Sequence, residues 1–205
     1  LIFARYLCST YNATVYLTGR SALNDARQQQ LDALNALGGK ALYVACDMND
    51  AARVQALIDT LGTNGHDLNG IIHSAGVIED NFILRQRQDP FERVITPKAI
   101  GSWLLDEATR ELSLDFFMLF SSVTGVLGNM GQCDYAYGNA FEDYFAHQRN
   151  RLQQLGQRSG KALSVNWPYW KDGGMRLTEK EASFLKTQFG IVPLLTDDGI
   201  AAFDC

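Results

Sequence analysis

A serine, a tyrosine and an asparagine stand at fixed spacing in the second half of the chain. Tyr135 lies thirteen residues after Ser122, and Asn139 lies four residues after Tyr135. Side chains four residues apart share one face of a helix, so Tyr135 and Asn139 are expected to lie side by side. Ser122 follows the apolar run 114–120, which is typical of a strand. The spacing therefore predicts that three polar side chains converge on one small volume.

These residue types suit the reduction of a carbonyl group. Hydride transfer to the carbonyl carbon leaves negative charge on the oxygen, which then needs a proton donor and a second hydrogen-bond donor. Tyr135 suits the first role and Ser122 the second. A phenol has a reference pKa of about 10 and is a weak acid at neutral pH unless a neighbouring cation favours the phenolate. Lys98, in a segment with apolar residues at roughly helical spacing, is the candidate cation.

Each of these residues has a structural explanation when it is taken alone. Tyr135 is consistent with a packing tyrosine, Ser122 with a strand end or a turn cap, and Lys98 with a solvated charge. Asn139 needs no functional reason to occur in a helix. The joint occurrence of all four, inside an alternation of strands and helices, favours a catalytic site over four separate coincidences.

Strands and helices alternate strictly around these residues. Strands are expected over 13–18, 41–45, 68–73, 114–120 and 162–167. Helices are expected over 1–8, from 24 to a left-handed cap at the glycine pair 38–39, and over 50–61 and 89–112. Short continuous apolar strands that alternate with helices predict a parallel sheet covered by helices on both faces. The expected fold class is α/β, a Rossmann-like doubly wound parallel sheet.

Lys98, Ser122, Tyr135 and Asn139, with the flanking segments Phe-Ser-Ser-Val-Thr-Gly-Val and Gly-Gln-Cys-Asp-Tyr, resemble the ketoreductase domains of modular polyketide synthases. That family is a branch of the short-chain dehydrogenase/reductase superfamily. In simpler members the lysine stands four residues after the tyrosine, whereas this branch and this chain exchange the lysine and the asparagine. The resemblance covers essentially the whole chain, and the segment 165–175 is similar to that of synthases whose acyltransferase is supplied in trans.

The resemblance implies a reaction and partners. The expected activity is NADPH-dependent reduction of a β-ketoacyl thioester to the β-hydroxyacyl thioester. The substrate is expected on the phosphopantetheine arm of an acyl carrier protein. Tyr135 would donate the proton, Ser122 would hold the carbonyl oxygen, and Lys98 would lower the tyrosine pKa. Asn139 would order the lysine or a relay water.

Arg20 and Ser21 follow the strand expected over 13–18. An acidic residue at this position usually binds the ribose hydroxyls of NAD, whereas a guanidinium suits the 2′-phosphate of NADPH. Arg20 and Ser21 therefore indicate NADPH as the cofactor. A surface arginine at a strand end is the alternative.

Further cofactor contacts are expected at the ends of later strands. By the resemblance, Asp47 meets the adenine edge and Met48 packs on the ring, although Asp47 is equally suited to cap the following helix. Small residues after the strand 68–73 allow the backbone to approach the nicotinamide ribose, unless they only form a tight turn. The remaining predicted cofactor-binding residues are Ser74, Ala75, Gly76 and Pro168.

Two positions bear on the stereochemistry of the product. The run Ile78, Glu79 and Asp80 resembles the Leu-Asp-Asp signature of B-type ketoreductases, which give the D-configured hydroxyl, and only Asp80 matches it fully. Leu127, eight residues before Tyr135, stands where the opposite class has tryptophan. Both features indicate a D-configured product. Other expected substrate contacts are Gln132 and Met175.

A glycine pair precedes Met175 and the helical segment 178–189. Gly173 and Gly174 would give the backbone freedom that a closing lid needs. The alternative is a loop and helix that only pack on the sheet.

Composition agrees with a globular domain. The chain has 46% hydrophobic and 20% charged residues and a net charge of -5, without the basic bias of a nucleic-acid-binding protein. It contains no run of eighteen apolar residues and no signal peptide, so we expect a cytoplasmic protein without membrane contact. The cysteines and histidines lack ligand spacing, which predicts reduced thiols and no metal site.

The strand and glycine-rich turn that usually open a dinucleotide fold are not found in this sequence. We therefore interpret residues 1–205 as the catalytic subdomain of a ketoreductase that lacks its start and its structural subdomain, with neighbouring synthase domains as partners. Two alternatives stay open, a catalytically silent scaffold domain and a free-standing dehydrogenase acting on a small alcohol or ketone.

Overall fold

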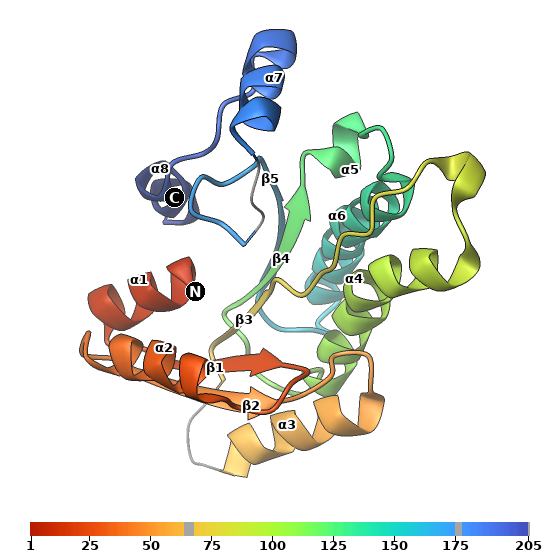
Figure 1. Cartoon of the computed structure of the whole chain (residues 1–205). Helices are drawn as coiled ribbons and strands as arrows, with labels where there is room; N and C mark the ends of the chain where they lie inside the picture. Colours follow the sequence, from red (N-terminus) through yellow and green to blue (C-terminus); the bar gives the residue numbers. More distant parts are fainter. Residues whose placement is uncertain (64–67, 175–177, 205) are drawn as a thin grey trace. The chain divides into compact units, whose positions relative to one another are not determined.

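The structure, a computed structural model, describes residues 1–63, 68–174 and 178–204. These residues divide into two compact units (Figure 1). One unit comprises Leu1–Ala45 with Pro168–Cys205, and the other comprises Cys46–Trp167. All strand pairs in both units are parallel, as predicted. No helix in the described part of the chain combines the length and the apolar character needed to cross a membrane.

The first unit contains a pair of parallel strands packed against helices. Its strands pair in register from Thr14 opposite Lys40 to Gly19 opposite Ala45. Ala4, Cys8, Leu31, Leu34 and Ala41 form the apolar cluster between the helices and the strands. The elements of this unit are α1 (Ile2–Tyr11), β1 (Thr14–Gly19), α2 (Asp25–Asn35), β2 (Lys40–Ala45), α7 (Glu179–Phe189) and α8 (Thr196–Phe203).

Helix α2 begins where predicted but ends early. The Asn24 side chain caps its start by accepting a hydrogen bond from the Arg27 N–H at 3.0 Å. The helix ends at Asn35, before the glycine pair at which the sequence predicted its cap. The Asn35 side chain accepts from the Ala41 N–H at 2.6 Å and therefore ties the helix end to β2. Gly38 adopts the left-handed region with φ of 107°, but within the following turn.

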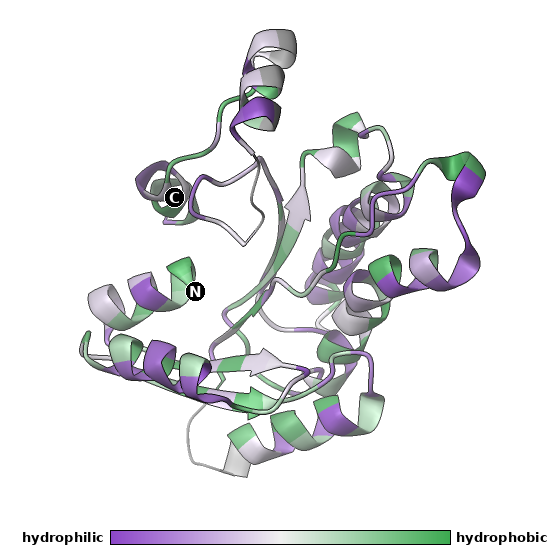
Figure 2. Ribbon diagram, in the orientation of Figure 1, coloured by the Kyte–Doolittle hydropathy of each residue, from purple (hydrophilic) through white to green (hydrophobic). Residues whose placement is uncertain are grey.

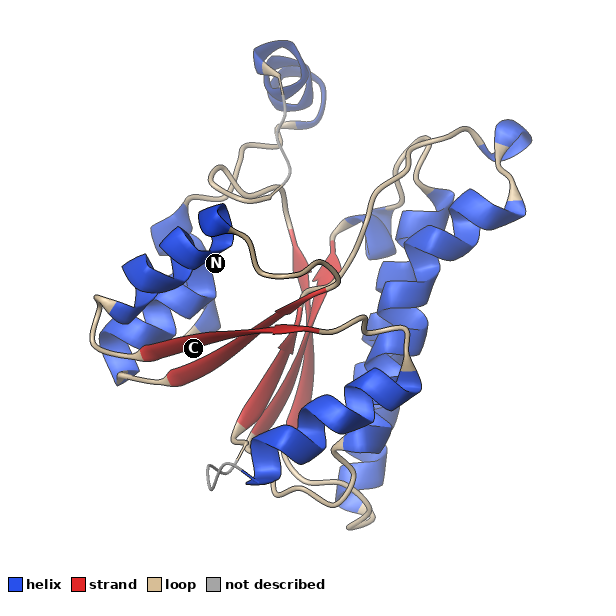
Figure 3. Ribbon diagram, turned by 60° about the horizontal axis from the view of Figure 1, so that its bottom comes forward, coloured by secondary structure: helices blue, strands red, loops and turns tan. Residues whose placement is uncertain are grey.

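The second unit holds a three-stranded parallel sheet in the order β3-β4-β5. Ser122 at the end of β4 lies opposite Trp167. Helices α4 and α6 run side by side along this sheet (Figures 1 and 3). The elements are α3 (Ala51–Thr63), β3 (Gly70–His73), the 3-10 helix η1 (Ile83–Arg85), α4 (Gln88–Ala108), β4 (Phe116–Ser122), α5 (Thr124–Leu127), α6 (Cys133–Gln154) and β5 (Lys161–Trp167).

Strand β4 forms the centre of this unit. Phe117, Met118 and Leu119 are buried, and Figure 2 shows this part of β4 as a hydrophobic stretch. Consecutive residues of a strand point to opposite faces of the sheet, so burial of three in a row means that both faces are covered. The unbroken apolar stretch 116–120, within the strand expected over 114–120, predicted this environment.

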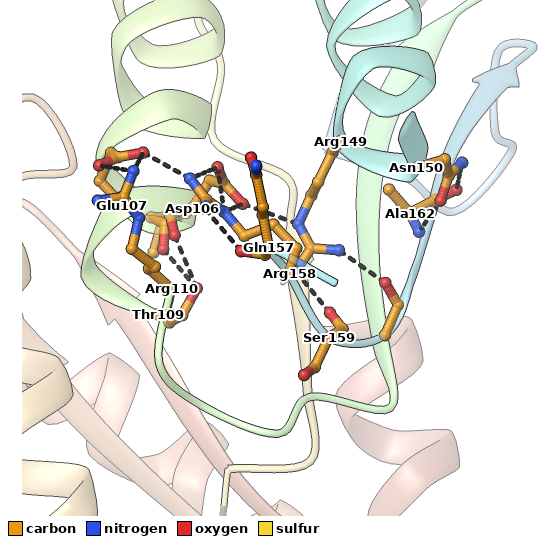
Figure 4. Close-up of polar contacts among 12 residues, drawn as sticks. Asp106, Glu107, Thr109, Arg110, Arg149, Asn150, Gln157, Arg158, Ser159 and Ala162 are labelled. Carbon is orange, nitrogen blue, oxygen red and sulfur yellow. Dashed lines mark hydrogen bonds and ion pairs between the residues drawn. The ribbon is translucent and has the colours of Figure 1, made fainter. Parts of the chain in front are cut away.

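A buried cluster of charges joins the end of α4 to α6 and to the turn before β5 (Figure 4). Arg149 donates from Nε to Asp106 Oδ1 at 2.9 Å, and Arg158 contacts Asp106 Oδ2 at 2.9 Å and Glu107 Oε1 at 2.6 Å. Arg149 also donates to the carbonyls of Ser159 and Gly160, each at 2.8 Å. We call Asp106, Glu107, Arg149 and Arg158 the Asp106 cluster.

Helix α4 ends at Ala108, four residues before the predicted end. Thr109 donates its hydroxyl to the Leu105 carbonyl at 2.6 Å, which satisfies one of the carbonyls left open at the helix end. The Asp106 cluster fixes the last turn in the same place. Tertiary contacts, which the local pattern does not encode, therefore set this boundary.

Candidate active site

The four predicted catalytic residues all lie in the unit Cys46–Trp167. Lys98 comes from α4, Ser122 ends β4, and Tyr135 and Asn139 stand on α6. The Lys98 ammonium lies 5.9 Å from the centre of the Tyr135 ring. The Tyr135 hydroxyl interacts with the side chains of Ser122 and Asn139. The structure therefore brings the four residues together at the carboxyl-terminal end of β4.

Lys98 is almost completely buried, with 3% of its surface exposed. Its ammonium donates to the Phe120 carbonyl at 2.8 Å and to Glu142 Oε2 at 2.8 Å. Gly138 makes room for the lysine stem, since a Cβ at this position would lie 3.2 Å from Lys98 Cδ. Burial of a charged group is unfavourable unless it has hydrogen-bond partners, and the Phe120 carbonyl and Glu142 provide them for Lys98.

Residue His73, at the end of β3, anchors α4 directly beside Lys98. It is buried, and its Nε2 donates to the Pro97 carbonyl at 2.9 Å. Burial lowers the pKa of His73 to about 4, and the Lys98 charge acts in the same direction while the Pro97 hydrogen bond opposes it. The imidazole is therefore neutral at physiological pH, and it fixes the turn of α4 from which Lys98 projects.

The neutral state of His73 predicts a loss of stability in acid. The unfolded chain binds a proton at His73 below pH about 6.5, whereas the folded chain does so only near pH 4. His73 should therefore remove about 3 kcal/mol of unfolding free energy as the pH falls between these values. Urea unfolding at several pH values measures this loss. His73→Gln keeps an N–H donor without titrating, so a loss of equal size in this variant would contradict the assignment.

The structure does not show the lowering of the Tyr135 pKa that the sequence predicted for Lys98. Burial is the largest influence and raises the pKa of the Tyr135 phenol, while hydrogen bonds with Ser122 and Asn139 lower it. The Glu142 carboxylate raises it further. Lys98 is paired with Glu142 at 2.8 Å, so its positive charge is partly balanced beside the phenol.

Asn139 is fully buried and bonds within its own helix. Its Nδ2 donates to the Tyr135 carbonyl at 2.6 Å, and its own carbonyl accepts from the Ser121 hydroxyl at 3.1 Å. Within the described residues its Oδ1 has no hydrogen-bond partner. The sequence predicted that Asn139 orders the lysine or a relay water. In the described residues its Nδ2 bonds to the tyrosine backbone, and its Oδ1 stays open to a water.

Two of the predicted stereocontrol residues, Asp80 and Gln132, meet at the start of α6. Gln132 donates to Asp80 Oδ1 at 2.9 Å, and the backbone N–H of Asn81 donates to the Gly131 carbonyl at 2.8 Å. One loop therefore carries Asp80 next to the helix that carries Tyr135. Leu127 is 77% exposed on the one-turn helix α5. Met175 lies outside the described residues.

Several predicted cofactor residues lie in the same unit of the chain. Met48 is buried, and Asp47 accepts from the Asn49 N–H at 3.1 Å. Asp50, and not Asp47, caps α3, because its Oδ1 accepts from the N–H groups of the first turn. The run after β3 comprises Ser74, Ala75 and Gly76. Ser74 and Gly76 are exposed, and Ala75 is half-buried.

Arg20, Ser21 and Pro168 belong to the other unit. Arg20 and Ser21 are exposed directly after β1, as the sequence predicted. Ser21 is held through its carbonyl, which accepts from the Tyr43 hydroxyl at 2.6 Å. Pro168 is half-buried after β5. In the described part of the chain, no group of three or more potential metal ligands is found.

Glu142 and His73 are the site residues for which the sequence analysis gave no role. Glu142 follows Tyr135 by seven residues and Asn139 by three, so it shares their helix face. Its spacing from Tyr135 and Asn139 could therefore have identified Glu142 as a site residue from the sequence. His73 gave no comparable signal, because its role depends on a contact with α4.

Comparison with known proteins identifies the relatives of this chain. The family model of the KR domain matches residues 1–172. The polyketide synthase PksL of Bacillus subtilis is 46% identical over 202 residues, which are 98% of this chain and 4% of PksL. The polyketide synthase ThaG of Burkholderia thailandensis is 40% identical over 194 residues, 95% of this chain and 3% of ThaG.

Solved structures show the same relationship. A ketoreductase domain from the bacillaene assembly line matches with a TM-score of 0.95 and 38% identity, over 98% of this chain and 49% of that one. An N-terminal ketoreductase from the macrolactin assembly line matches with a TM-score of 0.85 and 40% identity, over 98% of this chain and 39% of that one. The Rossmann-like α/β fold predicted from the sequence is therefore confirmed.

Proposed function

This chain belongs to the KR domain family, the ketoreductase domains of polyketide synthases, and from this premise we propose that it reduces a β-ketoacyl thioester to the β-hydroxyacyl thioester with NADPH. One observation carries the proposal. A half-buried phenol, Tyr135, interacts with the side chains of Ser122 and Asn139 beside the buried ammonium of Lys98. This is the arrangement that protonation of a reduced carbonyl requires.

The residues divide the work between them. Tyr135 transfers its hydroxyl proton to the carbonyl oxygen as the C=O bond becomes a C–O–H group. Ser122 donates a hydrogen bond to the same oxygen while negative charge develops on it. Asn139 and Lys98 hold the tyrosine and a relay water, which replaces the proton that Tyr135 gives up. The open Oδ1 of Asn139 supports such a water, because a buried oxygen without a partner is unfavourable.

The nicotinamide cofactor supplies the hydride when it is bound. Residues after β3 suit its ribose, because Ser74 and Gly76 are exposed and Gly76 has no side chain. Gly76 lies next to the lysine, since a Cβ at this position would be 3.4 Å from Lys98 Cε, in van der Waals contact. Asp47 and Met48 are proposed at the adenine. The exposed guanidinium of Arg20, next to Ser21, suits the 2′-phosphate that distinguishes NADPH from NADH.

We further propose a D-configured product. The hydrogen bond between Asp80 and Gln132 holds the loop that carries Asp80 against the start of the helix that carries Tyr135. A substrate that enters along this loop would present a single face of its keto group. Leu127 stands where the opposite class has tryptophan, which also supports a D-configured product.

The substrate is proposed to arrive on the phosphopantetheine arm of an acyl carrier protein. Residues 1–205 would then work as the catalytic subdomain of a larger synthase, beside a structural subdomain and other domains. The share of the relatives that the chain matches supports this organisation, since it spans 4% of PksL and 49% of the bacillaene ketoreductase chain.

Oxidation of NADPH by the purified protein with a β-ketoacyl thioester tests the proposal. We expect turnover with NADPH, much slower turnover with NADH, and the D-hydroxy product by chiral analysis. The L product would overturn only the stereochemical assignment. Binding of NADPH without any turnover would contradict the proposed reaction and favour a catalytically silent scaffold domain.

A further inference from the structure

Glu142 is a buried carboxylate beside the proposed proton donor. None of its surface is exposed. Its Oε2 accepts from the Lys98 ammonium at 2.8 Å, and its Oε1 has no hydrogen-bond partner in the described part of the chain. A carboxylate without exposure is rare unless it is paired, so this position is built around the lysine.

The geometry divides the Lys98 charge between two acceptors. The ammonium is held by Glu142 from α6 and by the Phe120 carbonyl from β4, each at 2.8 Å. It also lies over the Tyr135 ring, 5.9 Å from its centre. Glu142 therefore determines both where the ammonium lies and how much of its charge remains unbalanced near the phenol.

We propose that Glu142 is a positioning residue that keeps Tyr135 in its protonated form by pinning and balancing the Lys98 ammonium. The inference rests on the proposed reductase function. Reduction consumes a proton from the Tyr135 hydroxyl, whereas the reverse oxidation needs the phenolate to accept one. An unbalanced ammonium would favour the phenolate. The carboxylate on the opposite side of Lys98 thus adapts the site to reduction.

The charged and titratable groups around Glu142 support this direction. Lys98 faces it from α4, and Tyr135 and Asp143 lie on its own helix, α6. The charge of Lys98 also acts on His73 in β3, whose imidazole is neutral at physiological pH. Burial raises the pKa of Glu142 to about 8, against the effect of Lys98. The pKa of Tyr135 is raised from 10, so Glu142 is ionised throughout the range in which the phenol titrates.

The pH dependence of reduction by Glu142→Gln tests the proposal. Glutamine keeps an oxygen that can accept from Lys98 but removes the negative charge. The midpoint of the alkaline decline in kcat/KM should therefore fall by about one pH unit relative to the wild type. Asp143→Asn is the matched control, because it removes the same charge from the next residue, which bonds to Ser164 and Asn166. Its alkaline midpoint should stay at the wild-type value.

A second measurement does not depend on activity. Titration of tyrosine labelled with ¹³C at Cζ, with Tyr135→Phe to assign the signal, reports the Tyr135 pKa directly. It should fall by about one unit in Glu142→Gln and return towards the wild type in Glu142→Asp, which restores the charge. A merely structural role would change stability without moving this titration.

The outcomes separate the two proposals. Normal reduction by the wild type, with an unchanged Tyr135 titration in Glu142→Gln, would overturn the role of Glu142 and leave the reductase function standing. An absence of reduction by the wild type, with a shifted titration, would overturn the function and keep the electrostatic role. If Glu142→Gln does not fold, the titration of Glu142→Asp decides, because the shorter carboxylate should leave the Tyr135 pKa between those of the wild type and an uncharged site.

Discussion

Replacement of Tyr135 by phenylalanine should lower kcat for reduction of the β-ketoacyl thioester by roughly 10³-fold. The change removes only the hydroxyl that donates the proton, so the proton for the substrate oxygen would have to come from solvent, although Ser122 can still donate its hydrogen bond. The ring remains and still packs beside Lys98. Binding of NADPH, measured by its fluorescence, should therefore stay close to the wild-type value, and the loss should appear in single-turnover oxidation of NADPH.

Tyr137 provides a matched control for this experiment. It stands two residues further along α6, is 55% exposed, and contacts Phe91 with a ring separation of 6.2 Å. Tyr137→Phe removes a hydroxyl of the same kind from the same helix and should leave kcat unchanged. Equal rates for Tyr135→Phe and the wild type would falsify the assignment of Tyr135 as the acid.

The five strands and the positions of the four proposed catalytic residues could be predicted from the sequence. Strand positions follow from short apolar runs, and a local signal such as 114–120 directly reports a buried strand. The helix that carries Tyr135 and Asn139 follows from their spacing. Short elements such as α5 and η1 were not predicted, because three or four residues carry too little periodicity to read.

Helix ends were harder to predict because tertiary contacts decide them. Asn35 ends α2 through its bonds to Ala41, six residues away, and the sequence instead pointed to the glycines that follow. Asp106 holds the end of α4 through arginines more than forty residues further along the chain. Such partners leave no pattern in the segment that they terminate.

The electrostatics of the site also depends on tertiary contacts that the local sequence does not encode. Spacing placed Lys98 near Tyr135, and the sequence then predicted that the ammonium lowers the phenol pKa. The direction is different in the structure, because burial dominates and Glu142 shares the lysine charge. Whether the Lys98 ammonium acts mainly on Glu142 or on Tyr135 depends on distances between side chains, and sequence spacing does not give these distances.

The Asp106 cluster should carry a large part of the stability of the unit Cys46–Trp167. Asp106→Asn should lower the unfolding free energy by about 3 kcal/mol, because two buried guanidinium groups lose their shared carboxylate. The side chains of Arg149 and Arg158 are 1% and 4% exposed, so water cannot replace the lost partner. Urea unfolding followed by circular dichroism measures the change.

Glu107→Gln is the matched control for this prediction. It also removes one negative charge that contacts Arg158, but the Glu107 side chain is 35% exposed, so solvent compensates and the loss should be about 0.5 kcal/mol. Equal losses in the two variants would contradict the view that burial of Asp106 determines its effect. Lys98 lies two helical turns before Asp106 on α4, with its own anchors at Glu142 and Phe120. At temperatures where Asp106→Asn remains folded, kcat should therefore equal that of the wild type, which separates the stabilising cluster from the catalytic one.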